Sequence, residues 1–306
     1  MKITHGIEYA LVRALAYVVQ RLDDEEADWF GARLGRLGYY LAKSRVIVAQ
    51  KNLEAAFGAE MNESRRIEVS RLVFENIGRT LTEIARFPLY TPEKIRSSMK
   101  LEGVNYIEEA AAHGKGIMVV CPHFGNWELI GAWMPAHGYV MSFLVGRQSN
   151  KFIDGLMNYW RRCVGVGVIE GGSSVRPILA ALRRGESIGI VPDQHSAIGH
   201  VRAKFFGREI AAHKGPALFA YRTGAAIIPA YAVRFGPADH RGWAFEPIYA
   251  DKTKSEESEV LRITQEILDI FEKGIRRYPE MWLWTHKRWK PLDPVSASAP
   301  EISNQS

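Results

Sequence analysis

From residue 100 onward, short apolar runs alternate with stretches of helical periodicity. The apolar runs, each short enough to be a buried strand, are 116–122, 139–145, 166–170, 187–192 and 225–233. The helical stretches are 126–137, 151–163, 174–184, 214–223 and 254–277. Regular strand–helix alternation predicts an α/β fold in which a largely parallel central sheet is covered by helices.

The first hundred residues differ, because helical periodicity runs through them without strand-like alternation. Segments 46–57 and 64–87 each have an apolar residue every three or four positions. Ser64 is a suitable N-cap for the second segment. We therefore expect a helical region ahead of the sheet.

The N-terminus predicts an amphipathic helix, with apolar residues at helical spacing between Ile7 and Leu22. Arg13 lies inside the apolar stretch and acidic residues follow it, which suits neither a spanning helix nor a cleaved signal peptide. Its apolar face therefore packs on the protein core, or the helix contacts a membrane, either lying on its surface or serving as a short anchor. Aromatic residues and a lysine between residues 29 and 43 favour the membrane interface. The predicted fold thus includes an N-terminal helical membrane-associating region.

These patterns divide the chain into four regions. They are a membrane-associating helix at 1–24, a helical region packed on the core at 25–100, an α/β core at 101–290 and a disordered tail at 291–306. The tail is predicted to be disordered because it is rich in proline and serine and poor in apolar residues.

Charge and cysteine content narrow the range of partners. The net charge of +6 favours anionic partners, which include nucleic acid, acidic lipid headgroups and an acidic carrier protein. The chain has no GxxxxGK[ST] phosphate loop and no RNP-type aromatic motif, so nucleotide and nucleic-acid binding are not expected. Cys121 and Cys163 give no disulfide framework and fit a reducing compartment. Neither belongs to a cluster with zinc spacing, and we expect no metal site.

The stretch CPHFGNWE, residues 121–128, links the first strand candidate to a helix. Asn126 is a good N-cap, so His123 is predicted at the C-terminal end of a parallel strand and Glu128 in the first turn of the helix. Open α/β sheets place their reactive groups at this edge, and the turn can bring the two side chains together. The alternative is a loop histidine beside an acid that only complements the helix N-terminus.

Other polar residues lie at or near predicted strand ends. They are Arg147, Arg161, Arg162, Asp193 and Gln194. If the sheet is parallel, Arg147 and Asp193 share an edge with His123. Each of these residues alone can be an ordinary surface group. Together they predict a catalytic site that faces an anionic substrate.

Four blocks in order make the chain similar to a known family. They are HFGNWE, the VPDQ turn at 191–194, KFFGREIAAHKGPALFAYRTGAAIIP at 204–229 and PEMWLWTHKRWK at 279–290. The chain resembles the bacterial lipid A biosynthesis (lauroyl/myristoyl-type) acyltransferases of the lysophospholipid acyltransferase superfamily, whose hallmark is His-x4-Asp/Glu. The likeness runs from the N-terminal helix to Lys290. One departure is that His213 and Lys214 stand where relatives commonly have threonine and a small residue or proline.

The resemblance implies roles for several residues. It makes His123 the general base, Glu128 its partner and Asp193 a member of the site. It implies a functional arginine at Arg161 or Arg162 and leaves that choice open. It also implies an enzyme of the cell inner (cytoplasmic) membrane, with its site on the cytoplasmic side. Such an enzyme uses acyl carrier protein or coenzyme A thioesters and needs no cofactor.

The expected reaction is transfer of a fatty acyl chain to a hydroxyl of a phosphorylated glycolipid, and the acceptor that we expect is a lipid A precursor. A neutral imidazole can take the hydroxyl proton, a carboxylate can orient the ring, and arginines can bind phosphate. Three alternatives stay open. They are an acyltransferase for mannosylated phosphatidylinositol or another lysolipid, a His/Glu-dependent lipid hydrolase, and a non-catalytic membrane or carrier-binding protein.

Overall fold

A seven-stranded sheet forms the centre of the computed structural model, which describes residues 3–171, 175–196 and 199–292. The strand order is β1-β9-β8-β2-β5-β3-β4. The strands are β1 (Met99–Glu102), β2 (Ile117–Val120), β3 (Met141–Val145), β4 (Gly167–Glu170), β5 (Ser187–Ile190), β8 (Ala226–Gly236) and β9 (Asp239–Ala244). The five strands from β8 to β4 run parallel, while β9 pairs antiparallel with β8. The predicted α/β class with a largely parallel sheet is therefore confirmed.

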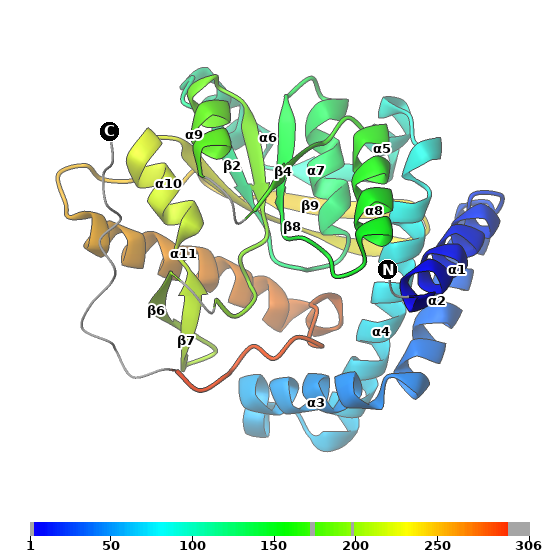
Figure 1. Ribbon diagram of the computed structural model, residues 1–306. Helices are drawn as coiled ribbons and strands as arrows, with labels where there is room; N and C mark the ends of the chain where they lie inside the picture. The colour runs from blue at the N-terminus through cyan, green and yellow to red at the C-terminus, as the bar shows by residue number, and fades with distance from the viewer. Residues whose placement is uncertain (1–2, 172–174, 197–198, 293–306) are drawn as a thin grey trace.

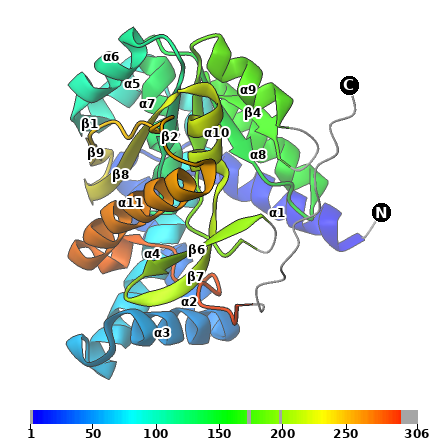
Figure 2. The same cartoon turned by 90° about the vertical axis from the view of Figure 1, so that its left-hand side faces the viewer.

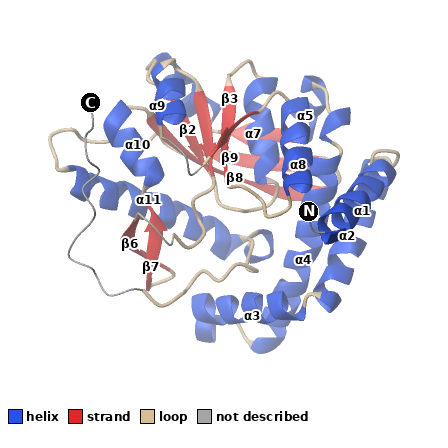
Figure 3. Cartoon of the chain, viewed as in Figure 1, coloured by secondary structure: helices blue, strands red, loops and turns tan. Residues whose placement is uncertain are grey.

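Helices cover both faces of this sheet (Figures 1 and 3). The α-helices are α1 (Ile3–Val19), α2 (Asp24–Leu41), α3 (Lys43–Phe57), α4 (Glu63–Ala85), α5 (Pro92–Ser98), α6 (Val104–Ala112), α7 (Trp127–Ala136), α8 (Lys151–Cys163), α9 (Arg176–Arg183), α10 (Gly215–Thr223) and α11 (Glu256–Arg277). Short 3₁₀ turns lie at Gly58–Glu60, Phe87–Leu89 and Pro279–Met281. The five predicted strands and the five helical stretches after residue 100 all correspond to observed elements.

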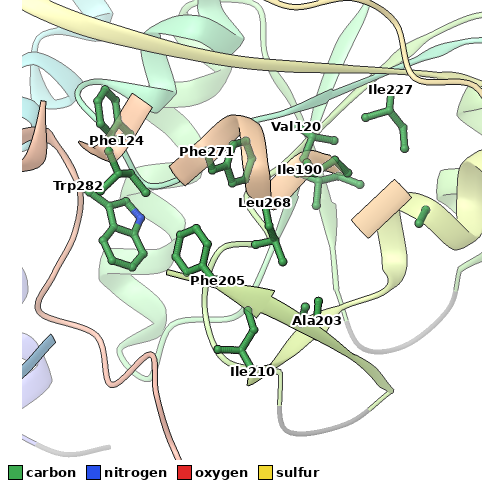
Figure 4. Close-up of a cluster of buried hydrophobic side chains, with 14 of the residues drawn as sticks. Val120, Phe124, Ile190, Ala203, Phe205, Ile210, Ile227, Leu268, Phe271 and Trp282 are labelled. Atoms are coloured by element: carbon green, nitrogen blue, oxygen red, sulfur yellow. The ribbon is translucent and has the colours of Figure 1, made fainter. Parts of the chain in front are cut away.

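Strand β2 shows how the sequence builds two cores. Its four residues are all buried, and side chains alternate between the two faces of a strand. Met118 and Val120 join the core that α9, α10 and α11 cover, whereas Ile117 and Val119 join the core under α7 and α8. Figure 4 shows part of the first core, to which both Val120 of β2 and Phe271 of α11 belong. A strand buried on both faces reads as a continuous apolar run, which is why this one was predictable.

A two-stranded hairpin and the sheet strands β1 and β9 were not predicted. Strands β6 (His200–Phe205) and β7 (Arg208–His213) pair antiparallel beside α11, as Figure 2 shows. Their tight turn has positive φ at Phe206 and Gly207, a conformation that the bulky Phe206 rarely adopts. Charged residues interrupt both runs, so their alternation is weak in the sequence.

The start of α4 also differs from the expectation. Its N-cap is Asn62, whose side chain accepts a hydrogen bond from the amide of Arg65, and not Ser64. Asparagine and serine are comparable caps, and the chain leaves the extended conformation two residues earlier than the apolar pattern suggests. Helices α1 to α4 lie to one side of the sheet in Figure 1.

Helix α1 buries only part of its apolar surface. Ala16 and Val19 are buried against the core under α7 and α8, whereas Ile7, Leu11 and Leu15 are exposed. Among the described residues, no helix combines the length and apolar character needed to cross a membrane. The predicted disordered tail falls almost entirely on residues 293–306, outside the described residues.

Candidate active site

His123 lies three residues past the end of β2, at the carboxyl edge of the parallel strands. Strand β5 is the direct neighbour of β2, and their register pairs Val120 with Ile190. The same offset of 70 residues pairs His123 with Asp193, which lies three residues past β5. The sheet therefore brings together two turns that are far apart in the sequence.

The His123 side chain is bound by Asp193. Its ring Nδ1 lies 2.6 Å from Asp193 Oδ1, and its backbone amide donates to Oδ2 at 2.9 Å. The indole N–H of Trp282 donates to the same Oδ2 at 2.7 Å. Both carboxylate oxygens thus accept hydrogen bonds, and Asp193 is only 2% exposed to solvent.

The electrostatics of this pair favour an ionised carboxylate. Burial alone would raise the pKa of the Asp193 carboxyl, but the His123 ring, the Trp282 indole and the His123 amide together hold it below its usual value. An ionised Asp193 accepts a proton-bearing Nδ1, so the hydrogen-bond network assigns the proton of the neutral ring to Nδ1. The other ring nitrogen, Nε2, then has a free lone pair.

Glu128 has a different partner from the one expected. Its carboxylate accepts from Arg161 Nε at 2.9 Å and from Nη2 at 2.5 Å, while Arg161 Nη1 donates to Asn158 at 2.8 Å. No hydrogen bond among the described residues joins Glu128 to the His123 ring. The first turn of α7 directs Glu128 toward α8, where this bidentate arginine satisfies it.

His123, Glu128 and Arg161 nevertheless line one cavity of about 480 Å³. It opens at the ends of β2, β3 and β5, and its wall includes the apolar side chains of Phe143 and Phe219. The cavity therefore combines a titratable histidine, a bound ion pair and apolar walls, as ligand sites commonly do.

The remaining predicted site residues differ in whether they line this cavity. Arg147 and Gln194 line the cavity, and Arg147 forms an exposed ion pair with Glu170 at 2.9 Å. Arg162, next to Arg161 on α8, is exposed and does not line the cavity. The structure thus brings Arg147, Arg161 and Gln194 to one cavity and leaves Arg162 outside it.

The backbone of the His123 turn is fixed on two sides. Asn126 caps α7 as predicted, accepting from the amide of Leu129 at 3.0 Å. Gly125 has a positive φ of 55°, and a Cβ there would lie 2.0 Å from the carbonyl oxygen of Ala232. Only glycine fits this close approach.

The segment after α11 completes the site. Leu283 donates to the His123 carbonyl at 2.9 Å, and the Gly125 amide donates to the Met281 carbonyl at 2.9 Å. The role of Trp282 as a donor to Asp193 was missed, although the block PEMWLWTHKRWK contains it. Its row of tryptophans was the available signal, because a buried indole requires an acceptor. His213, also not predicted as a site residue, lines the cavity from the end of β7.

Residues 185–189 match the G-x-S-x-G pattern of serine hydrolases. Ser187 is buried and begins β5, at the opposite edge of the sheet from His123. A nucleophile elbow places its serine after a strand, so this serine does not belong to such an elbow.

Comparisons with known proteins find the same family that the four sequence blocks resemble. The family described as bacterial lipid A biosynthesis acyltransferase matches residues 2–291. A lipid A biosynthesis palmitoleoyltransferase of Escherichia coli is 28% identical over 274 residues, 89% of this chain and 87% of the relative. A lipid A biosynthesis lauroyltransferase of the same organism is 26% identical over 294 residues, 93% of this chain and 89% of the relative. A phosphatidylinositol mannoside acyltransferase of Mycobacterium tuberculosis is 27% identical over 222 residues, 70% of this chain and 68% of the relative.

Proposed function

Since this chain belongs to the bacterial lipid A biosynthesis acyltransferase family and is an acyltransferase, we propose that it acylates a hydroxyl of a phosphorylated glycolipid. The acyl donor is a thioester of acyl carrier protein or coenzyme A, and the acceptor is a lipid A precursor. One observation carries the proposal: His123, oriented by a buried carboxylate 2.6 Å away, lines a cavity with apolar walls.

His123 acts as the general base. With Nδ1–H donated to Asp193, Nε2 takes the proton of the acceptor hydroxyl as its oxygen attacks the thioester carbonyl carbon. The tetrahedral intermediate collapses with loss of the thiolate, which takes the proton from the imidazolium. The products are an ester and a free thiol, and no covalent acyl-enzyme is formed. Asp193 stabilises the imidazolium during this step.

Glu128 and Arg161 serve the site as a pair. Three guanidinium nitrogens of Arg161 already donate within the protein, so its charge is fixed at the cavity wall. A fixed positive group of this kind stabilises the oxyanion of the intermediate without moving during the reaction. Glu128 holds it there, and this is how we assign its part in catalysis.

Arg147 is the better candidate for binding the acceptor phosphate. It lies at the cavity rim, and its ion pair with Glu170 is exposed on both sides. Exposed ion pairs contribute little, about 0–1 kcal/mol, so a phosphate can replace Glu170 at low cost. Arg161 and Arg162 fit this task less well, because the first is bound to Glu128 and the second lies outside the cavity.

Helix α1 is proposed to hold the protein at the cytoplasmic face of the inner membrane. Ile7, Leu11, Leu15 and Val18 are exposed and follow one another at spacings of four or three, which places them on one face. The helix is joined to the site through Asn150, which donates to the carbonyl of His5 and caps α8. Membrane contact and cavity are therefore built on adjoining helices.

The 27% identical relative supports a second candidate acceptor, a mannosylated phosphatidylinositol. An acceptor panel separates the two. Purified protein is given a labelled acyl thioester with a lipid A precursor, its dephosphorylated form, or a phosphatidylinositol mannoside. We expect the highest kcat/KM for the phosphorylated lipid A precursor. Preference for the mannoside would select the second candidate, and equal use of the dephosphorylated lipid would remove the phosphate from the proposal.

A further inference from the structure

A buried polar network lies beneath the turn that carries His123. Asn76, Thr80 and Glu83 follow one another along a single face of α4, at spacings of four and three residues. They hydrogen-bond toward β8 and toward Gly125 and Asn126, two of the residues that separate His123 from Glu128. The helix thus reaches the middle of the turn from outside the cavity.

Glu83 is the centre of this network. Its Oε2 accepts from Arg234 Nη2 at 2.6 Å and from Asn126 Nδ2 at 2.7 Å. Its Oε1 accepts from Arg234 Nε at 3.1 Å, and His240 Nε2 lies 3.3 Å away. Burial raises the pKa of the Glu83 carboxyl, but Arg234 and His240 outweigh it and hold that pKa far below its usual value. Both carboxylate oxygens are occupied, and the group is ionised.

The network fixes the turn at two successive residues. Asn126 donates its side-chain N–H to Glu83 and accepts with its side-chain oxygen from the amide of Leu129, so its orientation has one solution. Thr80 donates to the Gly125 carbonyl at 3.0 Å and accepts from Arg234 at 3.1 Å. The position of the α7 N-terminus therefore follows from where α4 holds Glu83.

A second carboxylate on α4 provides a contrast. Glu75 is also buried and also pairs with an arginine, Arg36, at 2.7 Å. Its ion-pair partners lie on α2 and α4, and within the described part of the chain no hydrogen bond or ion pair joins Glu75 to the turn. Buried ion pairs are often no more stabilising than apolar side chains of the same volume. The Glu83–Arg234 ion pair is hydrogen-bonded to the turn, so we explain it by the position in which it holds the turn and not by added stability.

We propose that Glu83 is a positioning residue for acyl transfer. Through Asn126 it sets the α7 N-terminus against the end of β2, and so sets the His123 ring opposite the Glu128–Arg161 pair. This inference rests on the function proposed above for His123.

Two variants and one matched control test it. Glu83→Gln removes the charge, and Asn126→Ser keeps a good cap while it removes the link to Glu83. Glu75→Gln removes a buried, arginine-paired carboxylate from the same helix without changing a residue that contacts the turn.

For each variant we measure kcat, the donor KM and the melting temperature, and the kinetics are recorded well below every melting temperature. Both turn variants should lose about ten- to a hundredfold in kcat, since small misplacements of reacting groups have effects of this size. The donor KM should change less than about threefold, because the cavity walls are intact. Glu75→Gln should lower the melting temperature and keep kcat.

The outcomes separate this inference from the proposed function. If Asn126→Ser and Glu83→Gln keep kcat as well as Glu75→Gln does, Glu83 is structural only and the inference fails. If Glu83→Gln does not fold, Asn126→Ser decides alone. His123→Ala is run beside them: if it keeps wild-type turnover, the proposed function itself fails. Loss of activity in His123→Ala with full activity in Asn126→Ser would remove the positioning role and leave the function standing.

Discussion

Asp193→Asn is the sharpest single substitution that the site offers. In the wild type, Oδ2 accepts two N–H groups, from the His123 backbone and the Trp282 indole, and neither donor can become an acceptor. The oxygen of an asparagine must therefore remain at the Oδ2 position. Its NH₂ group then faces His123 Nδ1, where the wild type has an accepting oxygen 2.6 Å away.

The expected magnitude follows from the change of tautomer. Facing a donor, Nδ1 becomes an acceptor and the ring proton moves to Nε2, which can no longer take the hydroxyl proton. The whole general-base contribution is lost, about 10²–10⁴-fold in kcat. That factor corresponds to about 2.7–5.5 kcal/mol of activation free energy. The donor KM should change little, because Asp193 lies behind His123 and not on the cavity wall.

The assay is steady-state acyl transfer from a labelled thioester, with circular dichroism and thermal unfolding to confirm the fold. Glu128→Gln is measured in parallel, because the sequence pattern alone would make Glu128 the partner of His123. If Asp193→Asn keeps kcat within about threefold while folded, the reasoning from tautomers is wrong. If only Glu128→Gln shows the loss and its pH profile shifts, Glu128 orients the ring during turnover.

Three further outcomes are expected. Glu128→Ala should lower turnover by at least about 10²-fold and also lower the melting temperature, since Arg161 loses its partner; unchanged values of both would remove the ion pair from the account. The double variant Leu11→Glu/Leu15→Glu should float with liposomes less than the wild type, whereas Leu261→Glu on the exposed surface of α11 should float as the wild type does. Equal flotation of the wild type and both variants would place the membrane contact elsewhere. The pKa of the Glu83 carboxyl is lowered on folding, so its contribution to stability is complete above about pH 5 and is lost as the pH falls. Urea unfolding should therefore show a steeper loss of the free energy of unfolding between about pH 5 and 3 for the wild type than for Glu83→Gln, and parallel curves would contradict the assignment.

The sequence was informative where a side chain's surroundings come from its own neighbours. Continuous apolar runs marked the five parallel strands, and Asn126 marked the start of α7. The partner of His123 was not accessible in the same way, because it depends on β5 lying between β2 and β3. Strand order is a long-range property that a local pattern does not contain. Spacing favoured Glu128 as the partner, whereas strand adjacency gives the hydrogen bond to Asp193.

The Glu83 network was hidden for a related reason. Glu83 reads as an ordinary helical acid, and nothing near it in the sequence marks Arg234 on β8 or Asn126 as its partners. For Arg161 the sequence predicted a site residue but not its role. The sequence pattern does not distinguish an arginine that is bound to Glu128 from one that is available to bind phosphate. In both cases the sequence does not show which charged side chains already form ion pairs or hydrogen bonds with other residues of the folded protein.

Mass spectrometry of the acceptor lipid tests the proposed reaction at its product. Purified wild-type protein and His123→Ala are incubated with an acyl thioester and a phosphorylated lipid A precursor. The wild type should yield a lipid heavier by one ester-linked acyl chain, which mild alkali releases, and the variant should yield at least about 10²-fold less. Free fatty acid with an unchanged acceptor, or an equal yield of acylated lipid from His123→Ala, would contradict acyl transfer at this site.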